Sequence, residues 1–64
     1  MQEYKVKYNQ LLKRYNNGIK FLTENPQEKE KWLPELKSIM TELDKLIKKY
    51  YIHSENILNG FEEE

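Results

Sequence analysis

The sequence predicts an all-α protein: an antiparallel helical hairpin with a short C-terminal helix. The hairpin helices are expected over about 2–24 and 26–51, with a kink near Pro34, and the short helix over about 54–59. Two long stretches repeat apolar residues at spacings of three and four, which is the helical period. An Asn-Pro pair separates them, and an Asn-Gly pair closes the shorter third stretch.

Residues 2–24 predict one amphipathic helix. Gly18 is its weak position, because glycine costs about 1 kcal/mol relative to alanine inside a helix. The apolar pattern stays in phase beyond Gly18, so we expect a continuous helix in which this glycine permits close approach of a neighbour. A break at 16–18 is the alternative. The apolar stripe is about 100° wide and consists of Tyr4, Tyr8, Leu11, Leu12, Tyr15, Ile19 and Leu22.

A second amphipathic region begins after the Asn-Pro pair. Asn25 can cap a helix, and Pro26 suits a first helical position. Pro34 lacks an N–H group and disturbs the turn before it. We therefore expect a short helical segment over 26–32, then a kink or restart into a main helix over 34–51. The second stripe is about 140° wide and contains Trp32, Leu33, Leu36, Ile39, Met40, Leu43, Leu46, Ile47, Tyr50 and Tyr51.

The C-terminal segment predicts a foot that folds back on the hairpin. Ser54 is a plausible cap, and Gly60 ends a helix too short to be stable alone. Its apolar residues Ile57, Leu58 and Phe61 are expected to be buried against the end of the second helix or against a dimer partner. Because the second stripe is wider than the first, another chain is expected to cover the rest, which predicts a homodimer or higher oligomer.

Composition excludes several classes of protein. The 64 residues suffice for one domain, over 1–64, and contain no cysteine. A net charge of zero gives no general attraction to nucleic acid or membrane. Apolar runs of two or three residues cannot span a bilayer, so the cytoplasm is the expected compartment. His53 lacks neighbouring metal ligands, and no glycine-rich phosphate loop is present. We expect no enzymatic activity, no cofactor and no metal.

A small DNA-binding or transcription-regulating protein is the main alternative, and a purely structural oligomerisation element is the other. The segment 54–59 could be the second helix of a helix-turn-helix, but it offers few polar side chains to reach base edges, and three glutamates follow it. Residues 1–24 contain five Lys or Arg and two Glu, a net charge of +3, and form the other candidate surface. Solvated charges on a helical hairpin explain the same pattern.

The aromatic residues favour protein binding. Two packed helices make a thin core that cannot hide them all, and tyrosine and tryptophan are typical anchors of protein interfaces. The candidate partner-binding residues are Phe21, Trp32, Leu36, Tyr50, Tyr51 and Phe61. Core filling explains most of the aromatic residues equally well.

Arg14–Phe61 carries a resemblance to a known group of proteins. The stretches Tyr-Asn-Asn-Gly, Asn-Pro before Trp-Leu-Pro, and Ile-Leu-Asn-Gly-Phe are similar to those of small uncharacterised helical proteins from phages, prophages and mobile elements of low-GC Gram-positive bacteria. The resemblance implies a context: such proteins often bind a host protein, as regulators or as inhibitors of defence systems. It implies no catalytic role and assigns no site residues.

Overall fold

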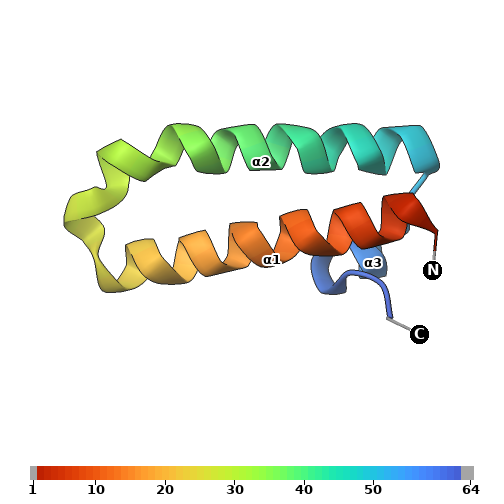
Figure 1. Ribbon diagram of the computed structural model, residues 1–64, viewed down its shortest axis with the longest axis horizontal. Coiled ribbons are helices and arrows are strands. Elements are labelled where there is room, and N and C mark those ends of the chain that lie inside the picture. Colours follow the sequence, from red (N-terminus) through yellow and green to blue (C-terminus); the bar gives the residue numbers. More distant parts are fainter. Residues whose placement is uncertain (1, 63–64) are drawn as a thin grey trace.

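The computed structural model of the chain describes residues 2–62 and has the expected all-α architecture. Two long antiparallel helices, α1 (Glu3–Glu24) and α2 (Lys29–Tyr50), form a hairpin (Figure 1). A 3₁₀ turn, η1 (Pro26–Glu28), begins the second arm, and α3 (Ser54–Asn59) follows it. Within the described part of the chain no strand occurs. The hairpin and foot form an elongated body with extents of 37 × 22 × 18 Å.

Helix α1 is continuous through Gly18, as expected. A Cβ atom at Gly18 would lie 2.5 Å from Leu36 Cδ2, so the missing side chain lets α2 approach closely at this point. At the other end of the hairpin, Tyr4 stacks on Tyr50. These two contacts fix the register in which the two helices pack.

The loop between the arms differs from the prediction in its capping. Asn25 occupies the N-cap position of η1 but makes no side-chain cap hydrogen bond there. Its side-chain amide and its backbone N–H instead donate to the carbonyl of Phe21, at 3.0 and 2.8 Å. Asn25 therefore closes the last turn of α1. Pro26 takes the first position of η1, as expected.

Pro34 lies inside one continuous helix. Helix α2 begins at Lys29, so the restart expected at Pro34 occurs five residues earlier, directly after η1. Pro34 removes the hydrogen bond to the carbonyl of Glu30 and kinks the helix. Both residues are exposed, so water can hydrate that carbonyl and the helix tolerates the proline.

The C-terminus of α2 is closed by a left-handed residue. Tyr51 has φ 52° and ψ 50°, and it follows the last helical residue. The N–H of Ile52 donates to the carbonyl of Ile47 at 3.1 Å, which is the hydrogen bond of a Schellman motif. Ile52 turns back into the core, where its side chain is buried. This turn sends the chain from α2 into α3.

The foot exists, but it packs on α1 rather than on α2. The Tyr8 hydroxyl donates to the carbonyl of Ile57 at 2.7 Å, and Phe61 lies edge-on to the ring of Tyr8. Asn9 clamps the backbone of Phe61: its amide donates to the Phe61 carbonyl, and its oxygen accepts from the Phe61 N–H, both at 2.7 Å. Ser54 is the first helical residue, and the N-cap is the preceding histidine.

The expectation that Leu58 is buried against the end of the second helix is wrong. Its side chain is 77% exposed, while Ile57 and Phe61 are half-buried against the core. A six-residue helix presents only one narrow side to its support, and Tyr8 and Asn9 fix which side that is. Leu58 then points outward.

The buried residues of the two long helices lie near the centres of the predicted apolar stripes, and residues at the stripe edges are more exposed. The buried residues are Tyr8, Leu36, Ile39, Leu43 and Ile52. Several stripe residues are exposed, in line with the expectation that two helices cannot cover this much apolar surface. Those that lie at least one-third exposed are Ile19, Trp32, Met40, Tyr50 and Tyr51.

Candidate functional site

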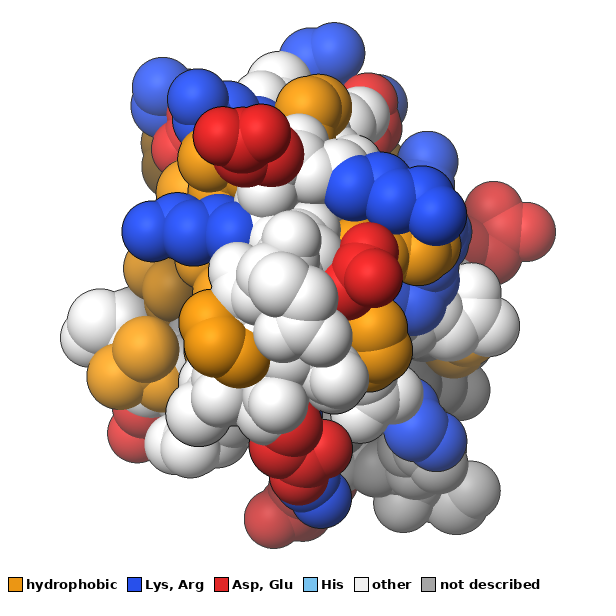
Figure 2. All heavy atoms as spheres, turned by 90° about the vertical axis from the view of Figure 1, so that its left-hand side faces the viewer, with side chains coloured by type: hydrophobic (Ala, Val, Ile, Leu, Met, Phe, Trp, Pro, Cys, Tyr) orange, Lys and Arg blue, Asp and Glu red, His pale blue; other side chains and the backbone are white. Residues whose placement is uncertain are grey.

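The six candidate partner-binding residues divide between the two ends of the hairpin. Phe21, Trp32 and Leu36 line a groove near the loop. Tyr50, Tyr51 and Phe61 line a polar hollow at the opposite end, beside the foot. The predicted single aromatic face is therefore two separate surfaces. Figure 2 views the loop end and shows apolar side chains on both flanks, each bordered by charged ones.

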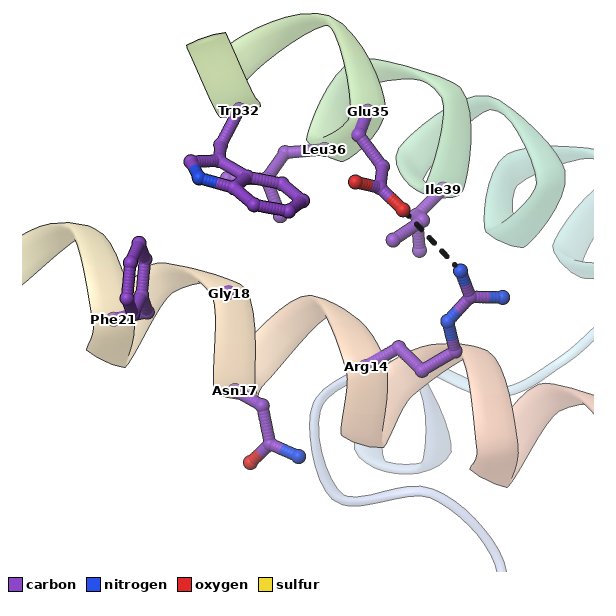
Figure 3. A pocket seen from close by; sticks show the side chains of 8 residues that line it. All are labelled: Arg14, Asn17, Gly18, Phe21, Trp32, Glu35, Leu36 and Ile39. Carbon is purple, nitrogen blue, oxygen red and sulfur yellow. Dashed lines mark hydrogen bonds and ion pairs between the residues drawn. The ribbon is translucent and has the colours of Figure 1, made fainter. Parts of the chain in front are cut away.

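The loop-end groove is a shallow apolar cleft of about 330 Å³ between α1 and α2 (Figure 3). Leu36 is buried and lies beside Gly18. Phe21 and Trp32 lie edge to face with ring centroids 6.1 Å apart, and both remain more than one-third exposed. Gly18 lets Leu36 pack directly on the backbone of α1, because a Cβ atom at position 18 would collide with the Leu36 side chain. The cleft can accept an apolar side chain from a partner.

A single ion pair spans the groove. Arg14 of α1 reaches Glu35 of α2 at 3.4 Å, and both side chains are largely exposed. Exposed pairs of this kind contribute roughly 0–1 kcal/mol. The pair therefore adds little to the fold, and either group can exchange its partner for a charge on another molecule at low cost.

The open-end surface is built on an aromatic cluster. The rings of Tyr4 and Tyr50 stack with centroids 4.1 Å apart and an interplanar angle of 8°. Phe61 lies edge-on to Tyr4 at 5.9 Å. Two lysines cover outer ring faces: Lys5 lies 5.4 Å from the Phe61 ring, and Lys49 lies 5.3 Å from the Tyr50 ring. Most of this cluster holds the foot to the hairpin, so the role of Phe61 is structural.

Tyr51 is the exception in this region. Its side chain is 88% exposed, the largest exposure among the apolar side chains that the structure describes. Its backbone occupies the left-handed conformation, which glycine adopts readily and other residues adopt at a cost of roughly 1–2 kcal/mol. The position therefore favours glycine, yet it carries an aromatic ring that is almost fully exposed.

The sequence alone did not predict the polar rim of the groove, which consists of Arg14 and Glu35. Arg14 and Glu35 lie in different arms, so only the register of the hairpin reveals that they meet. A seven-residue spacing is present in each arm of the hairpin. Lys7, Arg14 and Phe21 recur every seven residues, and so do Glu28, Glu35 and Glu42. Seven residues are close to two helical turns, so each set follows one side of its arm.

Within residues 2–62 no group of three His, Asp or Glu side chains is arranged to hold a metal ion. Burial raises the pKa of the Tyr8 hydroxyl, which donates its hydrogen bond inside the fold. Over the same residues neither long helix has the extended apolar stretch that crossing a bilayer requires.

Comparison of the chain with protein-family models, with curated proteins and with solved structures found no match.

Proposed function

We propose that this chain is a non-enzymatic protein-binding module that acts in the cytoplasm, with Tyr51 as the main anchor for its partner. The observation that carries the proposal is the exposed ring of Tyr51 on a left-handed backbone. Backbone strain in folded proteins concentrates at functional positions. Tyrosine is also among the residues that dominate the binding energy of protein interfaces.

The surroundings of Tyr51 suit a protein partner. The hollow beside it has a volume of about 940 Å³ and is lined by both aromatic and polar side chains, including His53 and Glu55. An aromatic anchor with a polar rim is the common arrangement in protein interfaces. Because the chain resembles phage, prophage and mobile-element proteins, the proposed partner is a host protein, which the chain would modulate as a regulator or as an inhibitor of a defence system.

A DNA-reading role for α3 has less support. The helix has six residues, and hydrogen bonds from Tyr8 and to and from Asn9 hold its C-terminal side against α1. A recognition helix must instead lie in the major groove and present several polar side chains. Glu55 in its first turn would meet phosphate unfavourably.

Affinity capture with matched baits tests the proposal. Wild type, Tyr51→Gly and Met40→Gln are immobilised, and lysate of a low-GC Gram-positive bacterium is passed over each. Met40 is the control, because it is also exposed but lies in the middle of α2. We expect a protein that wild type and Met40→Gln retain and Tyr51→Gly loses, as read by mass spectrometry.

The choice of glycine separates binding from folding. Glycine relieves the left-handed strain, so Tyr51→Gly is expected to be at least as stable as wild type. Loss of the partner therefore cannot come from unfolding. Retention of the same proteins by all three baits would refute the role of Tyr51.

A further inference from the structure

One broad side of the hairpin has no cover from its own chain. Leu12 lies beside Gly60 of the foot, and Arg14 lines the groove. Two residues along a helix turn by about 200°, so these side chains point to opposite sides of α1. The foot therefore covers one side, and the groove opens on the other (Figures 1 and 3). No residue of α3 lines the groove.

Charged side chains border this uncovered side in a complementary order. Each set of three is spaced by four or seven residues, so it follows one edge of its helix. From the open end toward the loop, α1 carries one negative charge and then two positive charges, at Glu3, Lys7 and Arg14. In the same direction α2 carries one positive charge and then two negative charges, at Lys49, Glu42 and Glu35.

We propose that a second copy of this chain docks on this side, with both loops at the same end of the dimer. In this arrangement α1 of each copy lies antiparallel to α2 of the other, as it does within the hairpin. The contact of Arg14 with Glu35 within the hairpin shows which levels of the two helices meet. The charges that face each other across the dimer are then Glu3 and the partner's Lys49, Lys7 and the partner's Glu42, and Arg14 and the partner's Glu35.

The reverse arrangement brings like charges together. With the loops at opposite ends, α1 would lie on the partner's α1, and α2 on the partner's α2. Lys7 and Arg14 of the two copies would then crowd one half of the interface, and Glu35 and Glu42 the other half. Charges at the edges of paired helices set their partner and orientation, and here they favour loops at the same end.

The uncovered side leaves apolar surface that a second copy would bury. Phe21 and Trp32 supply this surface at the loop end, and their rings remain exposed in the single chain. Docking covers both rings and the groove beside them.

Charge reversal tests the proposal. Sedimentation equilibrium is measured for wild type, for Lys7→Glu/Arg14→Glu, and for Glu35→Lys/Glu42→Lys, with circular dichroism to confirm that each remains helical. We expect a wild-type dimer and a dissociation constant raised on the order of a hundredfold in each variant at low salt. An equimolar mixture of the two variants should recover the dimer, because every reversed edge then meets an opposite charge.

The control variant makes the same change elsewhere. Lys13→Glu/Lys20→Glu reverses two charges on the outer side of α1, seven residues apart, and is expected to dimerise as wild type does. A wild-type chain that stays monomeric at all concentrations would overturn the proposal and assign the groove to a different protein. A dimer that neither groove-side variant weakens would overturn it as well.

The orientation is tested separately. The chain has no cysteine, so Gln27→Cys places one spin label in the loop of each copy. Pulsed electron resonance should give a distance well below the 37 Å length of the body. A distance at or beyond that length would mean loops at opposite ends and would refute the arrangement. Tyr51→Gly should dimerise normally, so failure of this proposal and failure of the proposed function are distinguishable.

Discussion

Replacing Asn9 with alanine should release the foot. Asn9 makes two hydrogen bonds of 2.7 Å to the backbone of Phe61, one as donor and one as acceptor. Each such bond contributes a net of about 0.5–1.5 kcal/mol, so Asn9→Ala should lower the free energy of unfolding by roughly 1–3 kcal/mol. In a domain of this size about 1 kcal/mol shifts the melting temperature by roughly 4–8 °C. Thermal melts followed by circular dichroism measure the loss.

Leu58→Ala is the matched comparison within the foot. A buried leucine costs about 2–5 kcal/mol when truncated to alanine. Leu58 is 77% exposed, so only a small part of that loss applies, and we expect about 0.5 kcal/mol or less. If the foot is held by the Asn9 clamp, Asn9→Ala melts several degrees lower than Leu58→Ala. Equal melting temperatures, or a lower one for Leu58→Ala, would refute this account of the foot.

Three further perturbations follow from the same contacts. Tyr51→Gly should raise the free energy of unfolding by about 0.5–1 kcal/mol, since relief of the left-handed strain exceeds the entropy cost of glycine; urea titration measures it, and a loss of stability would contradict the assignment of strain. Gly18→Leu should lower the melting temperature by more than 4 °C, because its side chain would collide with Leu36, already 2.5 Å from an ideal Cβ; an unchanged melt would show that the helices can separate without loss. Burial raises the pKa of Tyr8, so its contribution to stability is complete below the ordinary tyrosine pKa near 10 and is lost as pH rises through the higher pKa of the folded state. Urea titrations from pH 9 to 11 should therefore show that the free energy of unfolding falls more steeply with pH in wild type than in Tyr8→Phe. Equal slopes for the two proteins would count against this linkage.

The hairpin could be predicted because its information is local and repeated. Two stripes of about six turns each give many agreeing positions, and the continuity of α1 through Gly18 follows from the unbroken phase of its stripe. The sequence predicted that Gly18 permits a close approach of a neighbour, but it did not predict that this neighbour is Leu36. Identifying the neighbour requires the register of the two helices, which the loop alone does not fix.

The foot was misplaced because its pattern is too short. Six helical residues give one apolar pair, Ile57 and Leu58, and periodicity cannot say which of the two faces inward. The decision comes from polar groups of α1: the Tyr8 hydroxyl and the Asn9 amide each bond a backbone atom some fifty positions away. Asparagine within a helix carries no pattern that predicts such a bond.

The candidate sites were predicted only as a list of residues. Trp32, Phe21 and Tyr51, which the sequence indicated as candidate partner-binding residues, have exposed side chains. The sequence also indicated Leu36, which is buried and belongs to the core. Neither the division between two ends nor the ion pair across the groove could be predicted, because both depend on which residues of the two arms lie at the same level.

The clamp between the two ends of the chain has a consequence for the order of folding. Its hydrogen bonds join residues 49 and 52 positions apart, whereas the turn at Asn25 joins neighbouring residues. Closing a long loop costs more chain entropy than closing a short one, so the hairpin should form before the foot docks. Synthesis on the ribosome imposes the same order, because both hairpin helices are made before Phe61. The foot thus docks last and detaches first, and the amide of Phe61 should exchange with solvent faster than the amides at the centre of α1.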